Sequence, residues 1–152
     1  MANNPEIIKE LAQPFLEPGE LVLGAMNAQP KGRTTAMAGG GAASMIGQAM
    51  TGKVASNAKA VGLVVSASMA VVITQKRLIT AKIKISAMGA VTEVKEVMSS
   101  LPISEIDSVT AKRLGLGGIL SITANGGDPV KLECRVGPAR ELVEAFEKAK
   151  AS

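Results

Sequence analysis

Positive charge concentrated in one stretch is the main chemical feature of this sequence. The stretch from Leu21 to Thr92 contains no Asp or Glu, whereas all 13 acidic residues of the chain lie before or after it. The net charge of +4 therefore combines a basic middle with acidic flanks. A basic surface attracts nucleic acid, acidic lipid headgroups or acidic protein. The basic residues of the stretch are Lys31, Arg33, Lys53, Lys59, Lys76, Arg77, Lys82 and Lys84.

Side chains suited to catalysis or to metal binding are scarce. Histidine is absent and Cys134 is the single cysteine, which excludes Cys/His zinc sites, Ser-His-Asp and Cys-His catalysis and an intrachain disulfide. Cys134 lies in an alternating segment, Val130–Val136, so we expect a packed thiol. Gly115–Gly118 lacks a following Lys-Ser/Thr and precedes a strand, so it is a turn and not a phosphate loop. We therefore expect no catalytic site, no metal and no cofactor, and not an enzyme.

A run without charge lies within the basic stretch and is rich in Gly and Ala. Its small residues recur at every fourth position, which is typical of a helix on which another backbone packs closely. A Gly-rich linker is the alternative, but Met45 and Ile46 are apolar side chains that a linker does not need. The residues expected to pack on a partner are Gly39, Gly40, Ala43, Met45, Ile46 and Gly47.

Helix signals mark both ends of the chain. Asn4 and Pro5 suit the start of a helix, with Asn4 accepting from its first amides, and Pro14 ends the helix near Gln13. Gly137-Pro138 opens a second helix with an apolar stripe. That stripe is Ala139, Leu142, Val143 and Phe146.

Strand patterns fill most of the remainder, and a polar linker is expected from Lys53 to Lys59. Alternating or β-branched segments bounded by turn residues predict about seven strands. Asn125–Asp128 is a strong hairpin signal between the last two. The expected strands are Glu20–Asn27, Met69–Thr74, Ile79–Ile85, Val91–Val97, one within Pro102–Lys112 that runs through Ile106, Ser108 and Thr110, Ile119–Thr123 and Val130–Val136.

A mostly β (α+β) domain follows from these elements: about seven antiparallel strands closed by one amphipathic helix. The 152 residues suit one domain. We divide the chain into an N-terminal helix at 1–19 and a β domain at 20–152, with the Gly/Ala-rich insertion at about residues 34–53.

Three local patterns resemble the bacterial pleckstrin-homology-like (PH/GRAM-like) domains. They are the hairpin Val72–Ile79, the segment Leu101–Val109, and the final hairpin Gly118–Arg135 with its closing helix. The resemblance implies a partly open barrel of two packed sheets, plugged at one end by the C-terminal helix. Phosphoinositide-binding members of the wider superfamily carry clustered basic residues in the first hairpin loop. Here the corresponding connection, Asn27–Ala60, holds the Gly/Ala run instead.

Two functions remain open at this point. The first is a non-catalytic binding or scaffolding module that self-associates, or docks on a protein partner, through the insertion. The alternative is a peripheral membrane protein that binds anionic lipid through basic residues flanking the run or nearby. Those residues are Lys31, Arg33, Lys53, Lys59, Lys76 and Arg77.

Nucleic-acid binding is disfavoured, because Phe15 and Phe146 are the only aromatic residues and offer no stacking platform. Residues 1–6 lack the pattern of a signal peptide, so we expect a cytoplasmic protein, with membrane attachment only under the lipid alternative.

Overall fold

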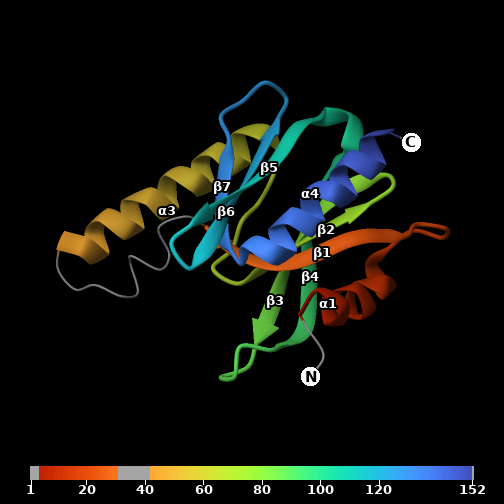
Figure 1. Ribbon diagram of the computed structural model, residues 1–152, viewed down its shortest axis with the longest axis horizontal. Coiled ribbons are helices and arrows are strands. Elements are labelled where there is room, and N and C mark those ends of the chain that lie inside the picture. Colours follow the sequence, from red (N-terminus) through yellow and green to blue (C-terminus); the bar gives the residue numbers. More distant parts are fainter. Residues whose placement is uncertain (1–3, 31–41, 152) are drawn as a thin grey trace.

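The computed structural model describes residues 4–30 and 42–151, and from 42 to 51 it describes the backbone alone. Figure 1 shows the arrangement of the elements. The helices are α1 (Asn4–Ala12), α3 (Ala42–Val61) and α4 (Val136–Ala151), with short 3₁₀ turns at Gln13–Phe15 and Ile103–Glu105. The strands are β1 (Val22–Pro30), β2 (Met69–Thr74), β3 (Arg77–Ile85), β4 (Val91–Pro102), β5 (Ile106–Leu114), β6 (Gly117–Ala124) and β7 (Val130–Cys134).

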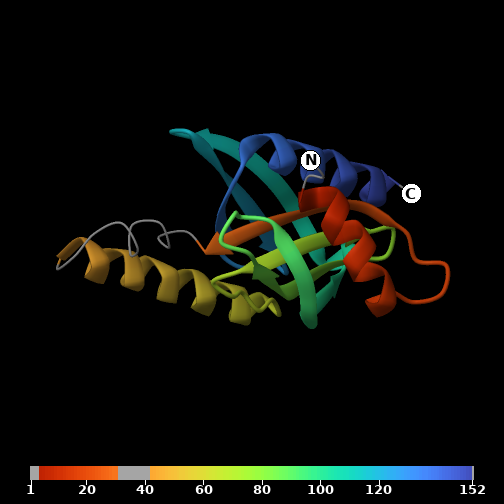
Figure 2. The same cartoon turned by 90° about the horizontal axis from the view of Figure 1, so that it is seen from below.

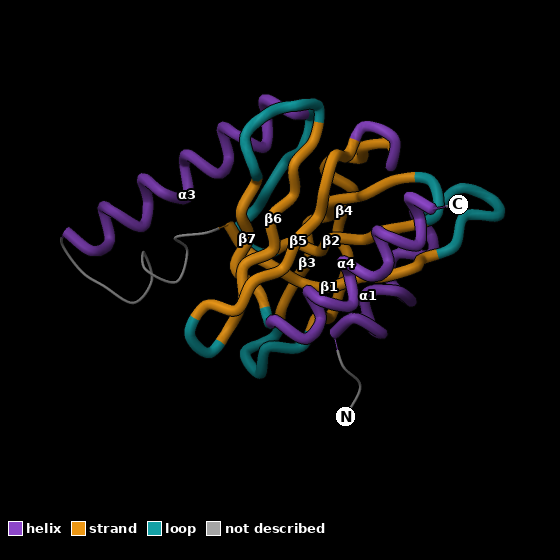
Figure 3. Tube along the Cα trace, turned by 45° about the horizontal axis from the view of Figure 1, so that its top comes forward, coloured by secondary structure: helices purple, strands orange, loops and turns teal. Residues whose placement is uncertain are grey.

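The seven described strands form one antiparallel sheet in the order β4-β3-β2-β1-β7-β6-β5. β1 lies at its centre, because Val22–Ala28 pair with β2 and the last two residues, Gln29 and Pro30, pair with β7. The sheet is curved into a partly open barrel, with β1 in the middle of its wall, and α4 closes the barrel on one side (Figures 1 and 3). The predicted class, a mostly β domain of seven antiparallel strands with a helix at each end, is confirmed.

Two hydrophobic cores stabilise the barrel. The larger core fills its interior and includes Leu120, Leu132 and the buried stripe of α4. The smaller core lies on the outer face of β1–β4, where Ile8 and Ala12 of α1 cover Ile79 and its neighbours. The predicted alternation in β3 is therefore confirmed, and its apolar face packs under α1.

Close packing between β1 and α4 depends on a residue without a side chain. A Cβ atom built on Gly24 would lie 2.7 Å from the Cβ of Ala145 and 3.4 Å from Cδ1 of Leu142. Atoms at the first distance overlap, so a larger residue at 24 would push the helix away from the sheet. The absence of a side chain at Gly24 sets how closely α4 approaches the barrel.

We expect Gly24→Ala to lower the free energy of unfolding by about 1–3 kcal/mol, because the added methyl group overpacks this contact. Urea unfolding measures the change. Gly137→Ala is the matched control, since a Cβ there meets nothing within 4 Å. Equal unfolding midpoints for the two variants would contradict the tight packing of α4.

Several predicted boundaries were wrong. The polar linker from Lys53 to Lys59 is part of α3, because Val54 and Ala58 are buried at helical spacing. β1 continues past Asn27 to Pro30, β4 past Val97 to Pro102, and β5 past Lys112 to Leu114. Long antiparallel ladders with β3 and β6 supply the partners that extend β4 and β5.

The cap predicted for Asn4 was also wrong. Its Oδ1 accepts a hydrogen bond from the amide of Val91 at 3.0 Å, and its Nδ2 donates to the carbonyl of Gly89 at 3.0 Å. Asn4 therefore fastens α1 to the β3–β4 hairpin.

Candidate functional site

The C-terminal half of α3 is anchored in the barrel. Val54, Ala58 and Val61 are buried in the interior core, where they join Leu63 just beyond the helix. These positions repeat every three or four residues and so share one side of the helix. The other end of α3 has a different environment.

The position at which α3 ends is fixed by hydrogen bonds. Gly62 adopts a φ of 92°, which favours glycine, and its amide donates to the carbonyl of Lys59 at 3.2 Å. The amide of Leu63 donates to the carbonyl of Ala58 at 2.8 Å, which completes a Schellman motif. Nδ2 of Asn125 binds the carbonyl of Val61 at 3.2 Å, so the end of the helix is tied to the turn after β6.

The outward side of the anchored half carries mostly small side chains. Two lysines are the charged residues on it, and no acidic residue occurs anywhere in α3. This side presents little bulk to an approaching backbone. Its exposed residues are Gly52, Lys53, Ala55, Ser56, Lys59 and Ala60.

The N-terminal half of α3 extends beyond the barrel in both perpendicular views (Figures 1 and 2). By helical spacing, positions 46 and 50 continue the row of 54 and 58. Isoleucine and methionine occupy them. The row that enters the core at one end therefore continues with large apolar residue types along the extended part of the helix.

Only some of the residues predicted to pack on a partner are among the residues that the structure describes. Gly39 and Gly40 lie outside the described residues. Ala43, Met45, Ile46 and Gly47 lie on α3, in the part described by its backbone. The helix expected for this part of the run is thus present from Ala42 onward.

The basic residues predicted to bind lipid are dispersed. Lys31 and Arg33 lie outside the described residues, whereas Lys53 and Lys59 are exposed on α3. Lys76 lies at the β2–β3 turn, where its Nζ is 3.6 Å from Oε2 of exposed Glu17.

Arg77 is engaged within the fold. Its Nε and Nη2 donate to the two carboxylate oxygens of Glu20, at 2.9 and 3.0 Å. Oγ1 of Thr74 donates to the same carboxylate at 2.7 Å, and the amide of Glu17 at 3.0 Å. Arg77 holds the pKa of Glu20 down at about 2. Its guanidinium is therefore a structural partner, and we leave it out of the candidate lipid contacts.

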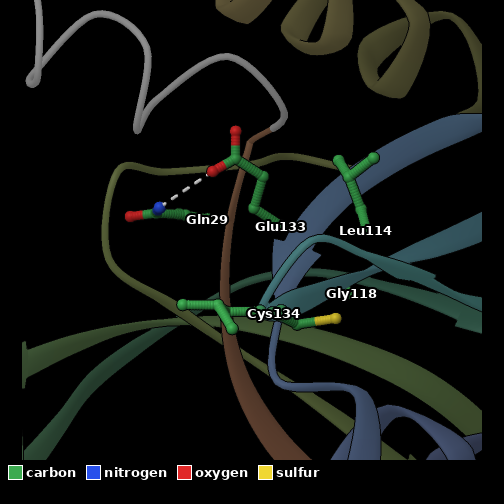
Figure 4. Close-up of a pocket in the computed structure, with 7 residues that line it drawn as sticks. Gln29, Leu114, Gly118, Glu133 and Cys134 are labelled. Carbon is green, nitrogen blue, oxygen red and sulfur yellow. Dashed lines mark hydrogen bonds between the residues drawn. The ribbon is translucent and has the colours of Figure 1, made fainter.

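Two shallow hollows lie side by side at one end of the barrel. The first, of about 410 Å³, lies between the end of β1, the β5–β6 turn and the end of β7. Gln29 and Glu133, paired residues of β1 and β7, point toward one another on its wall (Figure 4), with Nε2 of Gln29 donating to Oε2 of Glu133 at 3.2 Å. The second, of about 440 Å³, is lined by Asn4, the β3–β4 turn and the start of α4.

Cys134 lies on the wall of the first hollow. Burial raises the pKa of its thiol to about 11, so the thiol is protonated at neutral pH and is a poor nucleophile. Within residues 4–30 and 42–151, no cluster of three or more Cys, Asp or Glu side chains is arranged to hold a metal ion. The two hollows thus offer shape and polarity, with a protonated thiol on the wall of the first.

Comparison of the sequence with protein-family models and with curated proteins gave no match. The resemblance to PH-like domains therefore stays a prediction about the family. In the described part of the chain, no helix is long and apolar enough to cross a membrane.

Sequence reasoning missed two features of this surface. One is the anchoring of α3, for which the spacing of Val54, Ala58 and Val61 was the available signal. The other is a set of exposed aliphatic residues in hairpin turns, Met88, Leu114 and Leu116. Their signal was an apolar residue beside glycine in a turn, where polar residues are usual.

Proposed function

We propose that this protein is a non-catalytic binding module of PH-like architecture that self-associates through α3. The observation that carries the proposal is the extension of α3 beyond the barrel while its other half is fixed in the core. A second copy of the chain is the partner to which we commit. The experiment also tests the alternative, in which a different protein docks on the same helix.

Helix energetics support a partner for the extended part. Isolated helices shorter than about 12–15 residues are marginal in water, and most helices in proteins gain stability from tertiary packing. Gly within a helix costs about 1 kcal/mol relative to Ala, and α3 contains Gly47 and Gly52. Packing against a second helix would offset that cost.

The composition of α3 supports close helix–helix contact. Small residues on its exposed side let two backbones approach, and they lose little side-chain entropy when they are covered. Its two lysines, Lys53 and Lys59, have long stems that allow their charges to remain in water at the edge of such a contact. Self-association therefore needs no buried ion pair.

We expect Gly47→Leu or Ala55→Leu to convert the self-associated protein to a monomer, because a bulky side chain separates the packed backbones. Size-exclusion chromatography with light scattering measures the molecular mass over a range of concentrations. Lys53→Gln and Lys59→Gln are expected to leave the mass almost unchanged.

The matched control is Ala67→Leu, which adds the same bulk at an exposed position after α3. A wild-type protein that is monomeric at every concentration would contradict self-association. In that case α3 is the surface with which to search for a different protein partner.

A further inference from the structure

Three aliphatic side chains are exposed at hairpin turns. Met88, in the β3–β4 turn, is 93% exposed, and Leu116, in the β5–β6 turn, is 106% exposed. Leu114, which ends β5, is 55% exposed. Exposed side chains of this size are usually scattered, and a group of them at one place marks an interaction surface.

Both turns lie at the same end of the barrel (Figure 3). Leu114 and Leu116 line the first hollow together with Cys134, while Met88 lines the second hollow together with Arg135. Cys134 and Arg135 are consecutive, so the two hollows share the junction between β7 and α4. We name Met88, Leu114 and Leu116 the apolar tips.

Positive charge lies beside the apolar tips. Lys112 and Arg113 are exposed immediately before Leu114, and exposed Arg135 lines the second hollow together with Met88. No acidic residue occurs from Ser108 to Gly127, a stretch that contains β6 and all of β5 except Ile106 and Asp107.

The nearby carboxylates face the hollows or the strands. Glu133 and Glu141 line the hollows, and Glu133 binds Gln29 there. On the β3–β4 hairpin, Glu93 lies opposite Lys84 in the strand register. The tips therefore combine exposed aliphatic side chains with the exposed cations Lys112 and Arg113 of the β5–β6 hairpin.

From this juxtaposition we infer that the end of the barrel formed by the apolar tips binds the surface of an anionic phospholipid bilayer. Aliphatic side chains on protruding turns enter the acyl region of the bilayer. The fluid acyl chains can rearrange around each tip, so the tips need not be adjacent. Lys112, Arg113 and Arg135 meet the acidic headgroups. A protein partner would instead need cavities that match each tip. The inference is independent of self-association through α3.

Vesicle flotation of the full chain tests the inference, with phosphatidylcholine vesicles that contain or lack phosphatidylserine, at low and moderate salt. We expect binding only to the anionic vesicles, weakened by salt. Leu116→Ser is expected to weaken it about tenfold or more, because a buried leucine side chain is lost. Arg113→Gln is expected to weaken it about fivefold.

The controls change a leucine and a basic residue at the opposite end of the barrel. Leu21 is 65% exposed and its amide binds Gln75 of the β2–β3 turn, so Leu21→Ser is expected to bind vesicles as the wild type does. Lys76→Gln, in that same turn, is expected to do likewise. All four changes lie at exposed or partly exposed positions, and thermal unfolding confirms that each variant is folded.

Three results would overturn the inference. One is a wild type that binds no vesicle under any condition. Another is a loss of binding with Lys53→Gln and Lys59→Gln but not with Leu116→Ser, which would place the contact on α3. The third is a change of molecular mass with Leu116→Ser and no change in vesicle binding, which would make the tips a protein contact.

Discussion

Replacing Arg77 with alanine is expected to lower the free energy of unfolding by about 3–5 kcal/mol, because it leaves a buried charge without its partner. The side chain of Glu20 has no exposed surface, and Arg77 supplies two hydrogen bonds to its carboxylate. Thr74 and the amide of Glu17 cannot neutralise that charge. Urea unfolding at neutral pH, followed by circular dichroism, measures the loss.

Two further variants distinguish the loss of stability caused by breaking the buried pair from a general effect of removing positive charge. Lys76→Ala removes a neighbouring cation from an exposed pair with Glu17 and is expected to cost at most about 1 kcal/mol. Replacing both Glu20 and Arg77 with leucine is expected to recover much of the loss caused by Arg77→Ala. Equal costs for Arg77→Ala and Lys76→Ala would show that Glu20 is not buried as described.

The same pair makes stability depend on pH in the acid range. The pKa of Glu20 falls from its ordinary 4.5 to about 2 in the folded protein, chiefly because of the hydrogen bonds from Arg77. A lowered pKa contributes stability above the ordinary value, and that stability is lost as the pH falls toward the folded value. The contribution is about 3 kcal/mol, and the loss falls mainly between the two pKa values. Unfolding midpoints measured across this window should vary less in Arg77→Ala than in the wild type.

Replacing Phe146 with alanine is expected to cost about 3–5 kcal/mol, through lost burial and the cavity that remains. Phe146 is 3% exposed and lies in the interior core with Leu142 and Ala145 of the same helix. Phe146→Leu keeps most of the volume and is expected to cost less than the alanine variant. Thermal and urea unfolding measure both.

Glu147→Ala is the matched control for Phe146, because it changes the next residue on the solvent side of α4. We expect it to remain within about 0.5 kcal/mol of the wild type. A loss as small for Phe146→Ala would contradict the placement of α4 as the closure of the barrel.

The strands were predictable because their signals are local. The alternation of Ile79, Ala81 and Ile83 has period two, and Asn125–Asp128 carries the residues of a tight turn, as the paired β6 and β7 confirm. The stripe of α4 likewise follows from its own spacing. In each case the residues that decide the structure lie within a few positions of one another.

The pairing of distant segments was not predictable in the same way. Glu20 and Arg77 are 57 residues apart, and nothing in either local segment indicates that they meet. The helical state of Lys53–Lys59 depends on the core that receives Val54 and Ala58, and the polar residues between them favoured a linker. Tertiary packing overrides local propensity at such places.

The two candidate surfaces also differ in whether local sequence predicts them. The small-residue helix was expected from its spacing, whereas the tips at Met88, Leu114 and Leu116 become a group only when two hairpins meet at one end of the barrel. Leu116 lies between two glycines, so its exposure follows from the turn. Its location at the same end of the barrel as Met88 depends on the tertiary structure.

The central position of β1 has a consequence for how the chain folds. Gln29 and Glu133, which join β1 to β7, are 104 residues apart in sequence. The hairpins β3–β4 and β5–β6 close over short loops, while the β1–β7 junction closes a very long one at a higher entropic cost. During synthesis β1 therefore lacks its second neighbour until almost the whole chain has emerged. Until then one edge of this central strand is open to chaperones and to strands of other chains.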